Sequence, residues 1–349
     1  MNGNPQRFLA LDGLRGTCAI TVLLFHCVNL FRNGAVFAHG YLSVDVFFVL
    51  SGFVIALTYE RRLQTMGWKS FLGARARRLF PVYWLGNGIV LVIVWTVTAI
   101  GAFDLFHGDT RALAVTSALS MLLIPNLWNP AYVMYPENPV VWSLFGEWIA
   151  NALYGGGLFR LPSRLLAAIV ALGWGAMTVV GFHEPNGWCG GGSVGDIYIT
   201  VLRAVPGFTM GVLIHRAYAR GLLNRLPLVS PEWMFLAWLA LAALPTPAAT
   251  PILDAFIAIV AAPLIIVMLI RAEPLAAAFC KPLGDISYPL YTVHIGFVLL
   301  ATRTPLFGAD RHPNPLGVAA MIAISIAVAW GIARVTSRRK LERAVAAAA

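Results

Sequence analysis

The chain has 349 residues, of which 59% are hydrophobic and only 11% are charged. A water-soluble domain carries roughly 25% charged residues. Together with its repeated long apolar stretches, this composition predicts an all-α, polytopic membrane protein and excludes a large soluble domain beside the spans. The net charge of +10 does not indicate nucleic-acid binding, because the cations lie in short loops beside apolar stretches, where they set orientation and meet anionic lipid.

Ten apolar stretches are candidate membrane spans, in a single domain that covers 1–349. They lie at 11–31, 41–58, 79–101, 142–159, 164–182, 198–215, 233–247, 252–270, 284–302 and 315–334. The shorter stretch 111–124 reaches only about 21 Å as a helix, against a hydrocarbon core of roughly 30 Å. We therefore expect this stretch to be re-entrant or interfacial.

Basic residues predict the orientation of the spans. Segment 59–78 contains six Lys and Arg residues, and the connections 215–232 and 271–283 and the tail after 334 are also basic. Because positively charged loops stay in the cytoplasm, we expect all four segments and both termini to be cytoplasmic. The number of crossings is then even, which agrees with ten spans and with a stretch 111–124 that does not cross.

The first span carries two ionisable side chains, Arg15 and His26. Eleven helical steps separate Arg15 from His26, which corresponds to about 16 Å along a helix axis. This spacing places a permanent cation near one face of the bilayer and an imidazole well inside it. Ionisable groups inside a membrane are costly and are read as functional by default. Two of them at different depths favour an enzyme or a carrier that connects the two sides of the membrane.

Further polar residues fall toward the outer side of other spans. Asp45 begins the second span, Ser143 and Glu147 share one helix face at i,i+4 spacing, and His294 lies near the middle of its span. We expect His26, Asp45, Ser143 and Glu147 to converge in the outer half of the bundle. An imidazole beside a carboxylate is the usual general-base arrangement. His26 would take a proton from a hydroxyl, Asp45 or Glu147 would orient it or bind the acceptor, and Ser143 and His294 are candidate substrate-binding residues.

Structural roles are the alternative for these residues. A buried histidine such as His26 can simply hydrogen-bond a neighbouring helix, and Asp45 can be interfacial at the end of its span. A membrane carboxylate is costly unless it is paired or used. Glu147 would therefore be stabilised structurally by an ion pair with Arg111 or Arg203.

Three arginines lie on the predicted cytoplasmic side: Arg15, Arg75 and Arg78. Arg75 and Arg78 are i,i+3 and face one way if the third helix begins early. Guanidinium groups match the geometry of phosphate oxygens, so the three are candidates to hold a phosphorylated donor. The alternative is that they only set the orientation of the spans, although this applies less to Arg15, which lies inside the apolar pattern. Four scattered cysteines without a CxxC pair predict neither a disulfide framework nor a zinc site, and we expect no metal ion.

The chain resembles the acyltransferase-3 family of integral membrane acyltransferases in five motifs that occur in family order. The motifs are LDGLRG followed by a histidine, with ten residues between the arginine and the histidine (11–16 and 26), DVFFVLSGF (45–53), RARRLFPVYW (75–84), WSLFGEW (142–148) and ISYPLYTVH (286–294). Any one of them is weak evidence, but five in order across about 7–335 are specific. The resemblance implies about ten transmembrane helices in a bacterial inner membrane. It also implies transfer of an acyl group, usually acetyl, from cytoplasmic acyl-CoA to a hydroxyl of a glycan or similar acceptor.

The same resemblance implies roles for individual residues. Arg15 and His26 would be the essential pair, Arg75 and Arg78 would act on the donor side, and Glu147 is also implicated. Some family members carry an extra extracytoplasmic hydrolase-like domain, whereas this sequence predicts none, which leaves open a smaller acceptor or a separate partner.

We therefore predict a membrane O-acyltransferase whose partners are acyl-CoA, a hydroxyl-bearing glycan or small molecule, and membrane lipids, with no nucleic acid. One alternative is a transporter of a lipid, sugar or acyl group that uses an intramembrane proton relay. A CoA-independent scaffold is a second alternative, against which the costly His26 and Glu147 argue. The sequence leaves open whether His26 acts as a base or carries the acyl group briefly, and from which side the acceptor enters.

Overall fold

The structure, a computed structural model, describes residues 8–29, 37–102, 105–128, 133–184, 186–245, 250–303 and 315–348. Within these ranges the chain is mostly helical, with one antiparallel β-bridge, between Val133 and Ser193, and no strand. The helices are α1 (Leu9–Asn29), α2 (Ser43–Tyr59), α3 (Trp68–Ala99), α4 (Thr110–Met121), α5 (Val141–Gly156), α6 (Ser163–His183), α7 (Ile197–Ala219), α8 (Pro231–Ala242), α9 (Thr250–Phe256), α10 (Ala262–Leu269), α11 (Ala277–Arg303) and α12 (Pro315–Ala348). A π-helical stretch, Ile257–Ala261, joins α9 to α10.

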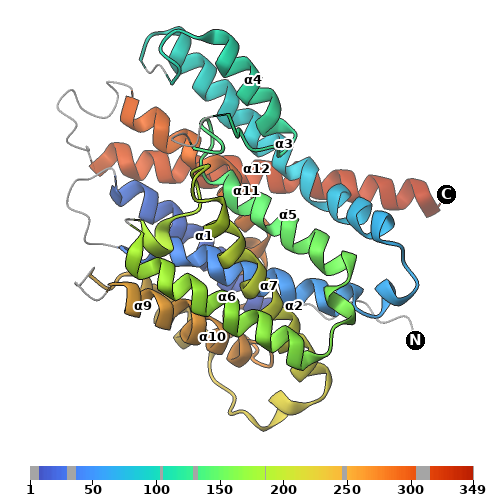
Figure 1. Ribbon diagram of the computed structural model, residues 1–349. Helices are drawn as coiled ribbons and strands as arrows, with labels where there is room; N and C mark the ends of the chain where they lie inside the picture. Colours follow the sequence, from blue (N-terminus) through green and yellow to red (C-terminus); the bar gives the residue numbers. More distant parts are fainter. Residues whose placement is uncertain are drawn as a thin grey trace.

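The predicted all-α, polytopic membrane fold is confirmed. Each predicted span overlaps a helix or the continuous helical segment formed by α9, the π-helical stretch and α10. Eight helical segments in the described ranges are long and apolar enough to cross a membrane. Helices α5 and α8, at the other two predicted spans, are shorter, with 16 and 12 residues. The stretch expected to be re-entrant or interfacial forms α4, which has 12 residues and packs beside α3 (Figure 1).

Helix α3 begins at Trp68, well before the predicted start of the third span at residue 79. The segment 68–78 is rich in Lys, Arg, Ala and Leu, which are strong helix formers. The basic connection therefore continues as helix where we expected a loop. Arg75 and Arg78 consequently lie on one face of α3, as their i,i+3 spacing required.

The centre of the bundle contains two tight helix pairs, α1 with α11 and α2 with α7. Where α2 meets α7, a Cβ atom on Gly52 would lie 1.9 Å from the carbonyl oxygen of Phe208, and one on Gly211 would lie 2.0 Å from that of Val49. Only glycine permits such an approach, so these two helices form a closely packed central wall. Helices α3 and α4 stand on one side of the centre, and α6, α9 and α10 on the other (Figure 1).

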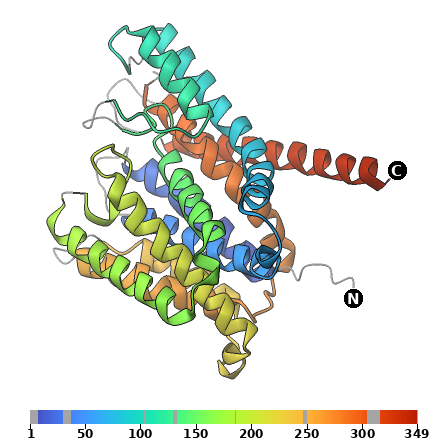
Figure 2. The ribbon, with the colours of Figure 1, turned by 45° about the vertical axis from the view of Figure 1, so that its right-hand side comes forward.

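Helix ends gather at two opposite ends of the bundle (Figure 1 and Figure 2). Phe8, just before α1, contacts Phe53 near the end of α2 and Tyr218 near the end of α7, with ring centroids 5.6 and 5.8 Å apart. We call this end of the bundle, where Arg15, Arg75 and Arg78 lie, the arginine end. There α1, α3, α6 and α11 begin, and α2, α5, α7 and α12 end. It positions the side chains that the sequence assigns to donor binding.

Candidate active site

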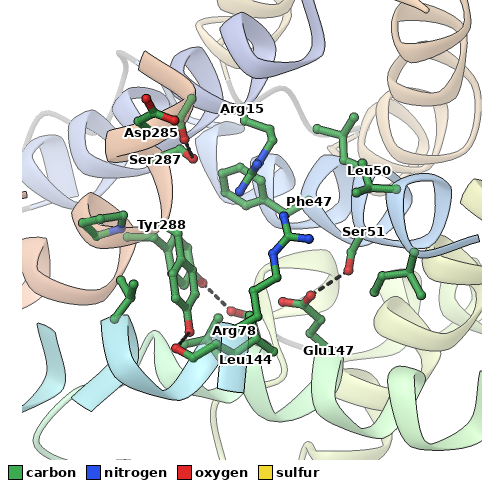
Figure 3. Close-up of a pocket in the computed structure, with 18 of the residues that line it drawn as sticks. Arg15, Phe47, Leu50, Ser51, Arg78, Leu144, Glu147, Asp285, Ser287 and Tyr288 are labelled. Atoms are coloured by element: carbon green, nitrogen blue, oxygen red, sulfur yellow. Dashed lines mark hydrogen bonds between the residues drawn. The ribbon is translucent and has the colours of Figure 1, made fainter. Parts of the chain in front are cut away.

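A cavity of about 250 Å³ opens between α1, α2, α3, α5, α11 and α12 toward the arginine end (Figure 3). Three cations, Arg15, Arg75 and Arg78, line it together with two carboxylates, Glu147 and Asp285. Figure 3 shows the side chains of Arg15 and Arg78 entering the cavity from opposite sides. The three arginines of the sequence prediction therefore meet in one cavity, although they lie on two different helices.

Glu147 is the partner of Arg75. The Arg75 guanidinium donates from Nη2 to Glu147 Oε1 at 3.5 Å and from Nε to Asn151 Oδ1 at 3.0 Å. Ser51 Oγ donates to the same Glu147 oxygen at 2.6 Å. Arg75 has 5% of its side chain exposed and Glu147 has 18%. This pair neutralises both charges in the cavity wall and fixes the direction of the Arg75 side chain.

Arg15 and Arg78 are the more accessible cations of the cavity. The Arg15 side chain is 33% exposed, and its Nη1 lies 3.9 Å from Asp12 Oδ1, one turn earlier in α1. Arg78 is exposed at the mouth. Because Arg75 is already engaged by Glu147, Arg15 and Arg78 are the guanidinium groups best placed to receive the phosphate oxygens of a ligand.

The inner part of the cavity is closed by a hydrogen bond between two buried side chains. Ser143 Oγ and the Tyr291 hydroxyl lie 2.6 Å apart, and Tyr291 also donates to the carbonyl oxygen of Val140 at 3.2 Å. The Tyr291 ring packs edge-on against Phe47, with centroids 5.8 Å apart. Polarity and exposure thus decrease from Arg78 at the mouth to this layer.

His26 does not line the cavity but lies behind that layer, against His294. The Tyr291 and His294 ring centroids are 5.8 Å apart, and His294 Nε2 lies 3.1 Å from His26 Nδ1. His26 is partly exposed, whereas His294 is fully buried. The pair joins α1 to α11, and His294 connects His26 to Tyr291, which itself lines the cavity.

The contacts of the two histidines define their tautomers. His294 Nδ1 lies 2.9 Å from the carbonyl oxygen of Tyr291 and 3.1 Å from that of Leu290. Carbonyl oxygens only accept, so Nδ1 carries the hydrogen, and in the neutral ring Nε2 is an acceptor. His26 Nδ1–H then donates to His294 Nε2 and to the carbonyl oxygen of Val22, which is 2.9 Å away. In the neutral His26 ring, Nε2 is therefore the nitrogen that carries the lone pair and can accept a proton.

Asp45 lies apart from His26, in a buried ion pair with Arg203. The guanidinium donates from Nη2 to Oδ2 at 2.7 Å and from Nε to Oδ1 at 3.2 Å, and both side chains are at most 1% exposed. Arg203 Nη1 also donates to the carbonyl oxygen of Gly190 at 3.0 Å. This geometry ties α2 to α7 and to the connection before α7. It shows that Arg203 is committed to Asp45, so it is not the structural partner of Glu147.

A second buried polar cluster, which the sequence pattern did not reveal, lies near Asp45. Asp254, in the span formed by α9 and α10, accepts hydrogen bonds from His39 Nδ1 at 2.7 Å and from the Tyr41 hydroxyl at 2.5 Å. His39 is 0% and Asp254 is 3% exposed. The rule that intramembrane carboxylates need partners could have drawn attention to Asp254. Its partners could not be found from sequence, because they lie more than 200 residues earlier.

The structure thus divides the predicted residues into three groups. Arg15, Arg75, Arg78 and Glu147 share the cavity, and Ser143 closes its inner part. His26 and His294 form a pair behind it. Asp45 belongs to a separate buried ion pair. Among the residues described, no group of three or more His, Cys, Asp and Glu side chains could hold a metal ion.

Comparison with known proteins assigns the class. The family model described as "Acyltransferase domain" matches residues 8–334, which is almost the whole helical bundle. The chain therefore belongs to this acyltransferase family, and the resemblance seen in the five motifs is confirmed. It is an integral membrane enzyme that transfers acyl groups other than aminoacyl groups.

Named relatives come from several bacteria. Exopolysaccharide production protein ExoZ of Rhizobium meliloti (strain 1021) is 28% identical over 323 residues, which cover 88% of this chain and 91% of that protein. Protein 2 in picA locus of Rhizobium radiobacter is 34% identical over 177 residues, 48% of this chain and 91% of the relative. Peptidoglycan O-acetyltransferase OatA of Listeria monocytogenes is 31% identical over 182 residues, 47% of this chain but 27% of its own length. No solved structure matches the chain.

Proposed function

We propose that this protein transfers an acyl group, most simply acetyl, from acyl-CoA to a hydroxyl group of a glycan or a similar acceptor. The observation that carries the proposal is the arrangement of a cavity rich in arginine at one end of the bundle and a histidine pair directly behind its inner wall. The names of two relatives, an exopolysaccharide production protein and a peptidoglycan O-acetyltransferase, support a saccharide hydroxyl as the acceptor.

The donor would enter from the arginine end. Arg15 and Arg78 would bind its phosphate oxygens, because these are the accessible guanidinium groups, while the ion pair with Glu147 holds Arg75 in place behind them. The thioester end would then point toward Ser143 and Tyr291. For the thioester to reach His26, the Tyr291 ring has to move aside.

His26 would supply the proton transfer. Its Nε2 takes the proton of the acceptor hydroxyl while the hydroxyl oxygen attacks the thioester carbonyl. The tetrahedral intermediate expels the thiolate, which receives the proton back from His26 and leaves as free CoA thiol. By accepting a hydrogen bond from His26 Nδ1, His294 stabilises the tautomer of His26 whose Nε2 can accept the proton. A transient acyl group on His26 would use the same nitrogen.

The membrane placement is part of the proposal. The arginine end carries the basic segments, so it would face the cytoplasm, with both termini on that side and the protein in the inner membrane. One domain would span the chain. Cysteine-accessibility labelling should place 59–78 inside and 125–141 outside. Labelling of 125–141 from the cytoplasm would make α4 a crossing helix and would refute this orientation.

Reconstituted protein tests the reaction directly. With radiolabelled acetyl-CoA and oligosaccharide acceptors, the wild type should transfer label to the acceptor, and His26→Ala should lose about 10²–10⁴-fold of the rate, the usual value of general-base catalysis. His183→Ala is the matched control, because His183 is exposed near the end of α6, away from the cavity. Near-normal transfer by His26→Ala would refute its role. Label that remains on denatured protein would identify an acyl-enzyme.

A further inference from the structure

A second cavity, of about 540 Å³, lies at the arginine end between the ends of α2 and α7 and the beginning of α6. It shares no lining residue with the candidate active site. Its walls are Glu60, Arg61, Pro162, Ser163, Arg164, His215, Arg216, Ala219 and Arg220. Arginine is therefore the commonest residue of the lining, and Glu60 is its single acidic member among the residues described.

The carboxylate on the inner wall of this cavity is already bound by neighbouring side chains of the protein. Glu60 accepts hydrogen bonds from His215 Nδ1 at 2.9 Å and from Arg216 Nε at 2.7 Å. Burial raises the pKa of Glu60, but these two hydrogen bonds outweigh it, so that the pKa lies below its usual range. Arg216 also donates to the carbonyl oxygens of Leu161 and Phe159 at 2.7 and 2.8 Å. Glu60 and one of the arginines, Arg216, are thus used by the fold itself.

Three cations remain around the mouth: Arg61, Arg164 and Arg220. All three are exposed and come from three different helix ends, so the fold brings them together. The beginning of α6 at Ser163 adds the positive end of a 21-residue helix. This arrangement matches a phosphate group, which guanidinium groups bind through paired hydrogen bonds.

An apolar stripe runs along α6, the helix whose first residues line this cavity. Leu165, next to Arg164, is 47% exposed, and Leu172 and Val179 follow at seven-residue spacing with 75% and 58% exposed. Residues seven apart lie on nearly the same face of a helix, so the stripe runs along α6 from the arginine end into the membrane region. Acyl chains attached to a headgroup in the cavity would lie along it.

We propose that this cavity binds the phosphate headgroup of an anionic phospholipid, with the lipid's acyl chains against the Leu165 stripe of α6. A basic pocket between membrane helices is the expected site for such a headgroup. Basic residues that only set orientation need to be on the correct side of the membrane. They do not need to surround one cavity in which Glu60 is already bound by His215 and Arg216. Nor do they need an exposed apolar stripe on the same helix.

The test uses purified, delipidated protein in neutral detergent, with added phosphatidylglycerol or, as the uncharged-headgroup comparison, phosphatidylcholine. Phosphatidylglycerol should raise the melting temperature and appear as bound lipid in native mass spectra, whereas phosphatidylcholine should do neither. The variant R61Q/R164Q/R220Q should lose the shift and at least tenfold of the bound lipid. The single variants R164Q and R220Q should each lose part of both, which guards against a fold defect in the triple variant.

A matched control separates this site from general electrostatics. R62Q/K69Q/R77Q removes three other exposed cations at the same end of the bundle, outside the cavity lining, and it should retain the shift. An equal loss in both triple variants would show a diffuse effect of charge and overturn the proposal. A shift produced equally by inorganic phosphate would overturn the assignment to a lipid. Neither readout depends on acyl transfer.

Discussion

Substitution of His294 by leucine tests the proposed role of this residue as the hydrogen-bond acceptor for His26. His294→Leu removes the acceptor that lies 3.1 Å from His26 Nδ1, but leaves the carbonyl oxygen of Val22 at 2.9 Å. The tautomer of His26 is therefore retained in part, and the loss is that of one buried hydrogen bond. At about 0.5–1.5 kcal/mol, this predicts a decrease of about two- to thirteenfold in kcat/KM. If His26 is the general base, its own loss is expected to cost about 10²–10⁴-fold.

The assay compares initial rates of acyl transfer and melting temperatures for His294→Leu, His294→Gln and His26→Ala in the same reconstituted membranes. The glutamine amide oxygen can accept from His26 Nδ1–H, so His294→Gln should recover part of the lost rate, whereas a purely structural role would not depend on an acceptor. A loss near 10³-fold in folded His294→Leu would show that His294 reacts directly. Unchanged kinetics would show that the contact is not used.

Three further predictions concern the arginine end. Glu147→Gln keeps the hydrogen bond from Ser51 but releases Arg75, so it should stay folded, as judged by melting temperature, and lose most of its acyl transfer. Unfolding with surviving activity at low temperature would make Glu147 structural. Arg15→Lys keeps the charge but not the planar fork, so the apparent KM for acyl-CoA should rise, and an unchanged KM would favour a topogenic role. The pKa of Glu60 in the folded protein is depressed, so ionised Glu60 stabilises the fold above the usual carboxyl pKa, and this stabilisation disappears as the pH falls through the folded pKa. Glu60→Gln should therefore make the melting temperature fall less steeply with decreasing pH than in the wild type. Equal decreases in melting temperature between pH 7 and pH 3 for the variant and the wild type would contradict this.

Apolar patterning and five motifs were sufficient to predict the helices and the family, because membrane spans need long apolar stretches whatever their neighbours are. Depth was harder to predict. Helix α3 begins at Trp68, about eleven residues before the apolar pattern does, which at 1.5 Å per residue moves the start of the helix by about 16 Å. Arg75 therefore lies inside the bundle and reaches Glu147, which the apolar boundaries had placed with His26.

Pairings between distant segments could not be predicted for a different reason. Asp45 and Arg203 are 158 residues apart in the chain, and their contact depends on the close approach of α2 and α7. That approach is set by glycines whose packing is visible only in three dimensions. The prediction of Asp45 as an orienting group for His26 considered depth alone, while the ion pair with Arg203 also required the lateral order of the helices.

A polar path that crossed the bilayer without interruption would conduct protons, and each charge that moved down a potential of 100 mV would dissipate about 2.3 kcal/mol. The cavity contains charged side chains, and the histidine pair adds two titratable groups beyond its inner wall. Between them stands Tyr291, bound to Ser143 and packed against Phe47. We expect this aromatic layer to block proton movement between the cavity and the histidine pair, so that acyl transfer does not dissipate the membrane potential.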